Sequence, residues 1–317
     1  MTALIDIAIT PTPDFSPYGI DSLWLDRAPK ARTLLVAYPH PDDESFGNGG
    51  TLARYAAQGV AVHYACATRG ECGTVDPPLL DGYADVAALR TAEQECAARA
   101  LGLAAVHFLG YRDSGMPGAP DNHHPSAFVQ APLEHAAGKL VALIRALRPQ
   151  VVLTFSSYGG YGHPDHIYIH YATRAAFAAA SDPVRYPEQI AAGLAPWRPA
   201  KLYYPTFGTR FIRLAIGGMR LLGRDPRRFG RNRDVDAERI VEETTPITTT
   251  IACGDWLEPN LRARQCHRSQ LGGGPPYKRL PRALVRRLLA AEHFTRAIPA
   301  WDTAAPRERD LFEGVDA

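Results

Sequence analysis

Short apolar runs recur along the chain, and stretches with helical spacing of apolar residues separate most of them. The runs rich in branched or aromatic residues, which predict buried strands, cover residues 34–37, 60–67, 106–109, 151–155, 201–205 and 244–253. The segments with helical spacing cover residues 45–58, 85–101, 131–147, 167–180, 209–222, 254–270 and 281–296. Strands that alternate with helices in this way favour an α/β fold built on a parallel sheet.

The alternation is regular in only one part of the chain, which divides the sequence into three parts. Residues 1–32 contain several prolines and no sustained period, so we expect an extended N-terminal arm. Residues 33–200 predict a Rossmann-like, doubly wound and mostly parallel sheet with helices on both faces. Residues 201–317 depart from the alternation, and we expect a C-terminal α+β elaboration of the same domain, with a glycine- and proline-rich break at 272–276.

Polar residues follow the strand at 34–37 directly, in the segment PHPDDE at residues 39–44. The two prolines fix φ and favour extended backbone in the residues before them. The carboxylates then stand at the start of the helix predicted over 45–58, where the helix dipole favours negative charge. A strand, a polar tip and a helix in this order place chemistry at the carboxyl edge of a parallel sheet.

A second polar loop follows the strand at 151–155 and contains the segment GHPDH at residues 162–166. Because parallel strands end at the same edge of the sheet, we expect both loops to meet there. His40, Asp43 and His166 then form a set of two imidazoles and one carboxylate. Three protein ligands leave one position of a zinc ion open for water, as in catalytic zinc sites. The sequence therefore predicts one divalent metal, with zinc as the default and ferrous iron also compatible.

The remaining polar residues of the two loops are candidates for catalysis. Asp42 lies beside a predicted ligand and can accept a proton from the attacking water as general base. His163 can act as the corresponding acid, or it can stabilise the oxyanion of a tetrahedral intermediate. Asp165 can orient His163 through its carboxylate and so set the tautomer of the ring.

Other interpretations of these loops make different demands on the chain. Either His-Pro-Asp triplet alone is more simply a proline turn with a capping aspartate, but two such loops at one sheet edge favour the metal site. A non-haem iron oxygenase also uses two histidines and one carboxylate, but such enzymes generally have β-rich scaffolds. A non-enzymatic sugar- or lipid-binding module would need a broken ligand set, and here all the candidate ligands are present.

The two loops closely resemble those of the LmbE-like, or PIG-L, family of N-acetylglucosamine-conjugate deacetylases. The segments that match the family pattern are residues 39–44, 68–71, 90–93, 111–116 and 162–166. The family usually has alanine where this chain has Pro39, a departure outside the ligand set. The similarity covers about residues 33–180, with a looser match at 264–270, and is greatest to the mycothiol-pathway deacetylases.

The resemblance implies a metal-dependent hydrolase that removes the acetyl group from an N-acetylglucosamine-type conjugate, a small molecule. It supports the ligand set and the roles of Asp42 and His163 given above. It further implies that Arg90 and Asp113 hold sugar or inositol hydroxyls and that Tyr161 assists at the carbonyl oxygen.

Simpler roles stay open for each of these last residues. Arg90 can form a surface ion pair with Glu93, which would carry little energetic weight. Asp113 can cap a turn through its own backbone, and Tyr161 can anchor its loop between glycines.

Composition limits the partners and the compartment. A formal net charge of +2 is close to neutral and gives no support for nucleic-acid binding. No apolar run approaches the length needed to span a bilayer, and residues 1–12 lack the pattern of a secretory signal. The five cysteines show no paired spacing, so we expect free thiols in a reducing cytoplasm.

One local charge bias occurs at residues 210–233, where eight arginines lie close to apolar residues. Such a segment could contact an anionic membrane surface. A helix with a core face and a solvated basic face is the interpretation that we favour. The sequence leaves the oligomeric state open.

Overall fold

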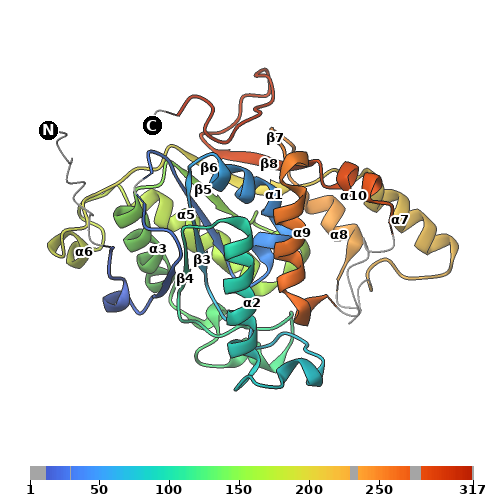
Figure 1. Ribbon diagram of the computed structural model, residues 1–317, viewed down its shortest axis with the longest axis horizontal. Coiled ribbons are helices and arrows are strands. Elements are labelled where there is room, and N and C mark those ends of the chain that lie inside the picture. The colour runs from blue at the N-terminus through green and yellow to red at the C-terminus, as the bar shows by residue number, and fades with distance from the viewer. Residues whose placement is uncertain (1–11, 29, 229–234, 272–279, 316–317) are drawn as a thin grey trace, which may run out of the picture.

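Figure 1 shows the computed structural model, which describes residues 12–28, 30–228, 235–271 and 280–315. The expected break at 272–276 and the first eleven residues of the expected arm lie outside these ranges. Among the described helices, none combines the length and the apolar character needed to cross a membrane.

The described residues form one mixed sheet of eight strands in the order β1-β4-β3-β2-β5-β6-β8-β7. The strands are β1 (Asp21–Trp24), β2 (Thr33–Tyr38), β3 (Ala61–Cys66), β4 (Ala105–Phe108), β5 (Val151–Thr154), β6 (Lys201–Thr206), β7 (Thr249–Ala252) and β8 (Ala291–Ile298). Strands β4, β3, β2, β5 and β6 pair in parallel, and β1, β8 and β7 extend the edges in antiparallel pairs. The predicted α/β class is confirmed, with a sheet that is mixed.

The parallel centre of the sheet is buried on both faces. Every residue of β2 and β5 is buried, and the register pairs Leu34 with Val62 on one side and with Val151 on the other. Strands covered on both faces consist of continuous apolar residues because no position faces water. This is why these two strands can be recognised in the sequence.

The strand order reverses beside β2. From β2 the chain continues to β3 and β4 on one side, whereas β5 and β6 lie on the other side. The connections after β2 and β5 therefore leave two neighbouring strands in opposite directions, which opens a crevice at their carboxyl ends. The polar segments 39–44 and 162–166 follow these two strands.

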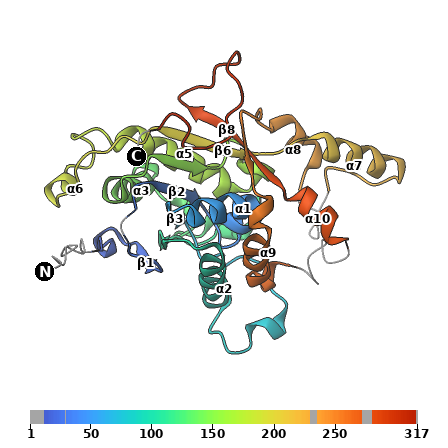
Figure 2. The ribbon, with the colours of Figure 1, turned by 45° about the horizontal axis from the view of Figure 1, so that its top comes forward.

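The helices cover the sheet in two groups. The α-helices are α1 (Asp43–Ala57), α2 (Val86–Leu101), α3 (Leu133–Leu147), α4 (Gly159–Gly162), α5 (Pro164–Ala179), α6 (Pro187–Ala191), α7 (Arg210–Leu221), α8 (Ala237–Glu243), α9 (Leu257–Cys266) and α10 (Arg282–Leu288). Helices α1, α2 and α9 contact one another, and α3 contacts α5. Figure 2 shows these two groups on opposite sides of the central strands. Since α9 comes from the C-terminal third, that third completes a layer of the core.

Most predicted elements are present with ends shifted by a few residues, and the larger errors lie towards the chain ends. The helix predicted over 281–296 is wrong in its second half, because α10 ends at Leu288 and β8 follows. Strand formation prevails there because β8 pairs with both β6 and β7 and buries Phe294. Strand β1, which pairs with β4 inside the expected arm, and helix α8 were not predicted.

The arginine-rich segment forms α7 and part of the loop after it, and its residues 229–234 lie outside the described ranges. Helix α7 buries Ile216 but leaves Leu221 90% exposed. Arg220 forms an ion pair with Glu238 of α8 at 2.7 Å. The expected basic face is therefore solvated, and the apolar face is covered only in part.

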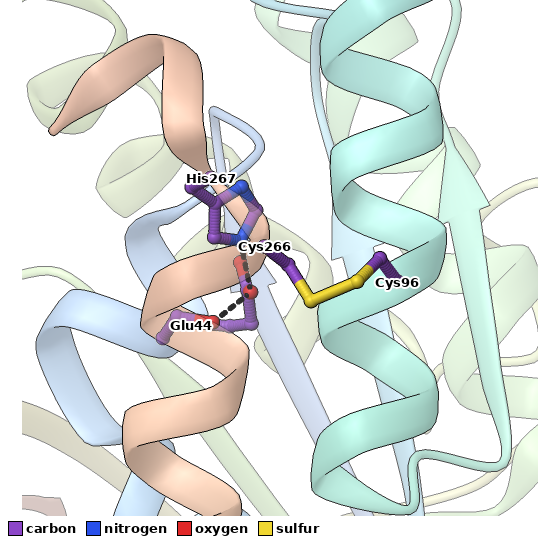
Figure 3. Close-up of a disulfide and its surroundings, with 5 residues drawn as sticks. Glu44, Cys96, Cys266 and His267 are labelled. Atoms are coloured by element: carbon purple, nitrogen blue, oxygen red, sulfur yellow. Dashed lines mark hydrogen bonds and ion pairs between the residues drawn. A yellow bond between two sulfur atoms is a disulfide. The ribbon is translucent and has the colours of Figure 1, made fainter.

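Cys96 and Cys266 form a disulfide, so the expectation of five free thiols is wrong. These residues are 170 positions apart in the sequence and meet because α2 packs against α9 (Figure 3). Spacing along the chain cannot reveal such a pair, because tertiary packing makes the contact. Cys66, Cys72 and Cys253 are free thiols. Cysteine usage consequently no longer argues for a reducing compartment.

Two buried histidines meet in the core on the neighbouring strands β3 and β4. His63 Nδ1 lies 3.1 Å from His107 Nε2, and Ser22 Oγ lies 2.8 Å from His107 Nδ1. Burial lowers the pKa of His63 from 6.5 to about 4, and burial also lowers the pKa of His107. The imidazoles of His63 and His107 therefore bind a proton more tightly in the unfolded chain than in the folded protein.

We expect the free energy of unfolding to fall by roughly 3 kcal/mol through His63 alone as the pH falls from about 6.5 to about 4. Stability is lost in this range because the imidazole of the unfolded chain is protonated there and the buried imidazole is not. Above this pH range both imidazoles are neutral, and the full stability is present. Urea unfolding measured across this range tests the expectation. The variant His63→Gln, which keeps a hydrogen-bonding group without titrating, should show a shallower pH dependence, and an unchanged slope would contradict the assignment.

Candidate metal centre

The loops after β2 and β5 bring His40, Asp43 and His166 together at the crevice. Helix α1 begins at Asp43, and α5 begins directly after His163, so each loop ends in the first turn of a helix. Gly159 has a φ of +68°, and a Cβ at this position would lie 2.5 Å from the Cβ of His166. Glycine is needed here because the loop must approach the start of α5 closely at His166.

The three candidate ligand groups form a compact triangle. His40 Nδ1 lies 3.2 Å from His166 Nε2, which lies 3.3 Å from Asp43 Oδ1. The Asp43 carboxylate closes the triangle with its other oxygen, Oδ2, which lies 3.5 Å from His40 Nδ1. A tetrahedral ion with ligand bonds of about 2.0–2.1 Å separates its ligands by about 3.3 Å. The residues present therefore fit a divalent ion.

Two carboxylates orient the His40 ring through Nε2, the nitrogen that does not face the other candidate ligands. Its Nε2 lies 3.1 Å from Asp165 Oδ2 and 3.6 Å from Asp113 Oδ1. In the singly protonated ring the proton therefore lies on Nε2, which leaves the lone pair of Nδ1 for a metal ion. Burial disfavours the imidazolium, but the carboxylates of Asp113, Asp165 and Asp43 together raise the pKa of His40 well above its usual value.

The other two candidate ligands are also fixed by neighbouring groups. The ring of Phe155 stacks on the His166 imidazole with 4.1 Å between the ring centres. The Asp43 carboxylate accepts a hydrogen bond from the backbone N–H of His40 at 2.9 Å. The hydroxyl of Tyr161 lies 3.4 Å from His166 Nε2. Two imidazoles and one carboxylate therefore converge in a buried place, where a bound cation would stabilise their lone pairs.

Asp42, the predicted base, lies beside the ligands in a left-handed backbone conformation with φ 110° and ψ −27°. Such a conformation costs roughly 1–3 kcal/mol outside glycine and persists only where neighbouring contacts enforce it. Asp42 Oδ2 lies 3.2 Å from Arg90 Nη2. Burial raises the pKa of Asp42 to about 6, and the Arg90 guanidinium opposes this rise. A carboxylate with a pKa near the working pH is well suited to accept a proton.

Arg90 is buried in the wall of the site. Besides its ion pair with Asp42, its guanidinium donates to the carbonyl of Gly70 at 3.1 Å. Gly70 has a φ of +69°, and a Cβ there would lie 2.0 Å from Arg90 Nη1. The simpler alternative of a surface pair with Glu93 is wrong, because Glu93 accepts hydrogen bonds from the backbone N–H and hydroxyl of Ser269 at 2.8 and 2.6 Å.

His163 and Tyr161 line a cleft together with His40 and Asp42. The backbone N–H of Asp165 donates to His163 Nδ1 at 3.1 Å, so the neutral ring carries its proton on Nε2. Burial lowers the pKa of His163 to about 4, and the nearby charge of His40 lowers it further in the same direction. Burial raises the pKa of the Tyr161 hydroxyl. Both side chains are therefore neutral hydrogen-bond donors near pH 7.

Asp165 has a different partner from the one that the sequence suggested. Its carboxylate accepts a hydrogen bond from the backbone N–H of Ser114 at 2.9 Å and faces His40. Its contact with His163 runs through the backbone N–H of Asp165. The residue therefore orients a ligand as well as the neighbouring imidazole.

Asp113 lies at the rim between the ligands and the cleft. Its carboxylate accepts hydrogen bonds from the backbone N–H groups of Gly115, at 2.8 Å, and of Cys72, at 3.3 Å. Burial opposes its charge, but the neighbouring His40 and the hydrogen bond from Gly115 lower the pKa of Asp113 below its usual value. Asp113 thus caps the loop locally and also lines the cleft.

The cleft that His40 and Asp42 help to line has a volume of about 480 Å³. The lining residues that the sequence did not single out for the site are Gly73, Thr74, Gly115, Met116, Val235, Ser269, Gln270 and Leu271. Val235 and residues 269–271 belong to the C-terminal third, which therefore forms part of the cleft wall. The signal in the sequence was the loose family match at 264–270.

Comparison with known proteins agrees with this geometry. The family model described as PIG-L: GlcNAc-PI de-N-acetylase matches residues 35–177. A 1D-myo-inositol 2-acetamido-2-deoxy-alpha-D-glucopyranoside deacetylase of Streptomyces avermitilis is 38% identical over 300 residues, which cover 90% of this chain and 97% of that relative. The chain belongs to the PIG-L family. A family member of the same name from Acidothermus cellulolyticus is 38% identical over 298 residues, 90% of this chain and 96% of its own length.

Solved structures share the fold of this chain. N,N'-diacetylchitobiose deacetylase from Pyrococcus horikoshii matches with a TM-score of 0.57 and 22% identity, covering 84% of each chain. The conserved protein TT1542 from Thermus thermophilus matches with a TM-score of 0.52 and 24% identity, over 86% of this chain and 98% of its own. At these identities the likeness concerns the fold alone.

Proposed function

We propose that this chain is a metal-dependent deacetylase that hydrolyses the N-acetyl group of an N-acetylglucosamine conjugate, and that its conjugate is the inositol glycoside named for its relatives. The observation that carries this proposal is the triangle of ligand groups from His40, Asp43 and His166, with the Asp42 carboxylate beside it. The names of the relatives support a small sugar conjugate as substrate, and the cleft has the size of a small-molecule site.

The residues of the site divide the reaction among them. A divalent ion held by the triangle would polarise the acetyl carbonyl and acidify the attacking water. Asp42 takes the proton from that water, and its pKa of about 6 keeps it ionised at neutral pH. The Nε2–H of His163 and the hydroxyl of Tyr161 donate hydrogen bonds to the oxygen that becomes negative. The proton on Asp42 then passes to the sugar nitrogen, and the amine and acetate separate.

Arg90 and Asp113 are proposed to hold hydroxyls of the sugar or the inositol, since both line the cleft. Arg90 has a second task, because its guanidinium is paired with Asp42 inside the wall. Asp165 keeps His40 in the tautomer that presents Nδ1 to the ion.

Zinc is the ion that we propose, although two histidines and one carboxylate also fit ferrous iron. The α/β scaffold disfavours an iron oxygenase, and the complete ligand set disfavours a module that only binds sugar or lipid.

We also propose that β4-β3-β2-β5-β6 form a Rossmann-like, doubly wound core, because the strand order reverses beside β2. Residues 33–200 would form this core, and residues 201–317 would elaborate it within one domain. Strands β8 and β7, which continue the sheet, and helix α9, which packs on α1 and α2, support this division.

Release of acetate and free amine by the zinc-loaded protein, measured across N-acetylglucosamine conjugates with different aglycones, tests the function. We expect turnover of the inositol conjugate and slower release from N-acetylglucosamine alone. Oxygen uptake measured with the ferrous protein tests the competing oxygenase. Oxygen consumption without acetate release would contradict the proposal.

A further inference from the structure

The segment after α9 contacts the start of helix α1 next to Asp42, the predicted base. His267 and Glu44 are both completely buried, and His267 Nε2 donates to Glu44 Oε1 at 3.0 Å (Figure 3). Glu44 Oε2 accepts a hydrogen bond from the backbone N–H of Asp42 at 3.1 Å. Neither His267 nor Glu44 belongs to the described residues that line the cleft. A chain of two hydrogen bonds therefore joins the C-terminal third to the predicted base.

The backbone of Asp42 requires such support. Its φ of 110° is a left-handed conformation that side chains other than glycine rarely adopt. The same N–H also faces Gln94 Oε1 of α2 at 3.3 Å. Since the carboxylate is attached to this backbone, a change in φ would turn Asp42 away from the ligand triangle. Holding the peptide therefore also aims the base.

The segment that carries His267 is itself attached to α2 on both sides. Directly before it, Cys266 is bonded to Cys96 of α2 (Figure 3). Two residues after it, Ser269 donates its backbone N–H and its hydroxyl to Glu93 of α2. His267 is thus placed between a covalent anchor and a hydrogen-bonded one, which limits its freedom to move from Glu44.

We propose that His267 is a positioning residue for the deacetylation: through Glu44 it fixes the backbone of Asp42, and the Cys96–Cys266 disulfide anchors it. The inference rests on the proposed function and deepens it. It gives the C-terminal third a part in catalysis in addition to its part in the cleft wall. His267 acts through Glu44 and Asp42 and contacts neither the substrate nor the ion.

The variants His267→Gln and His267→Asn form a matched test. The glutamine amide can reach about as far as Nε2 and donate to Glu44, whereas the asparagine amide is one methylene shorter. We expect His267→Asn to lower kcat roughly 10- to 100-fold, with KM and metal content close to wild type, because small misplacements of catalytic groups have effects of this size. His267→Gln should keep most of the wild-type kcat. Equal kcat values in the two variants would overturn the proposal.

An Asp42→Asn background separates positioning from general damage. With the base removed, His267→Asn should cause no further loss of the residual rate, because there is no base left to aim. A further loss of about 10-fold in this background would show that His267 acts by another route. That result would also overturn the proposal.

The hydrogen bonds from His267 to Glu44 and from the Asp42 N–H to Glu44 form a clamp on the Asp42 backbone. Hydrogen exchange at the Asp42 amide, followed by NMR, tests this clamp without substrate. We expect exchange at least about 10-fold faster in His267→Asn than in wild type, with His267→Gln close to wild type. If the wild type releases no acetate, the proposed function fails and the exchange rates alone decide the clamp. Should His267→Asn not fold, the double variant Cys96→Ser/Cys266→Ser, which keeps His267, decides instead. Faster exchange at Asp42 in that variant would support the anchored clamp, and a wild-type rate would overturn it.

Discussion

Replacing Asp42 by alanine is expected to lower acetate release by about 10²- to 10⁴-fold while the purified protein keeps its metal. The carboxylate of Asp42 lies beside the ligand triangle without forming one of its corners, so its removal leaves His40, Asp43 and His166 in place. The attacking water then loses its proton acceptor. Rates measured at saturating zinc, together with metal content, test this expectation.

Asp42→Asn is the matched control for shape. Asparagine fills the same volume and tolerates the left-handed backbone that Asp42 adopts at φ 110°. It cannot accept the proton, so its rate should be as low as that of the alanine variant. A wild-type rate in either variant would show that Asp42 is not the base.

Replacing His166 by alanine is expected to leave the protein without metal and without turnover. His166 Nε2 is one corner of the triangle, at 3.2 Å from His40 Nδ1 and 3.3 Å from Asp43 Oδ1. Loss of a direct ligand should weaken metal binding by more than the roughly 10- to 100-fold that removal of an outer partner causes. Metal analysis of the purified variant, with circular dichroism to confirm folding, provides the measurement.

His170→Ala is the matched control on the same helix. His170 lies one turn further along α5, is also buried, and has Nδ1 2.9 Å from the carbonyl oxygen of Phe155. Its removal deletes a buried imidazole of similar surroundings without touching the triangle. We expect this variant to keep its metal. Stoichiometric metal in His166→Ala, or equal metal loss in both variants, would refute the ligand assignment.

The central strands and the meeting of the candidate ligand residues could be predicted because their signals are local. Strands β2 and β5 are buried on both faces, so their residues form continuous apolar runs. The polar segments directly after them needed only one further rule, that parallel strands end at one edge. His40, Asp43 and His166 could be grouped for this reason before any distance was known.

The errors arose where a partner distant in sequence decides the outcome. The residues of β8 carry a pattern compatible with a helix, and pairing with β6 and β7 makes them a strand. Cys96 and Cys266 have no spacing that indicates a bond, because only the packing of α2 against α9 brings them together. In both cases the deciding contact joins segments that the chain connects only through long intervening stretches.

The sequence by itself determined the kind of chemistry, because ligand types, their order and the buried strands before them are properties of short segments. The tertiary structure alone decided how these groups are held. In the folded protein Asp165 contacts His40, Arg90 forms an ion pair with Asp42, and His267 forms a hydrogen bond with Glu44. The physical reason is that orientation depends on hydrogen bonds and packing between distant segments, which no local pattern specifies.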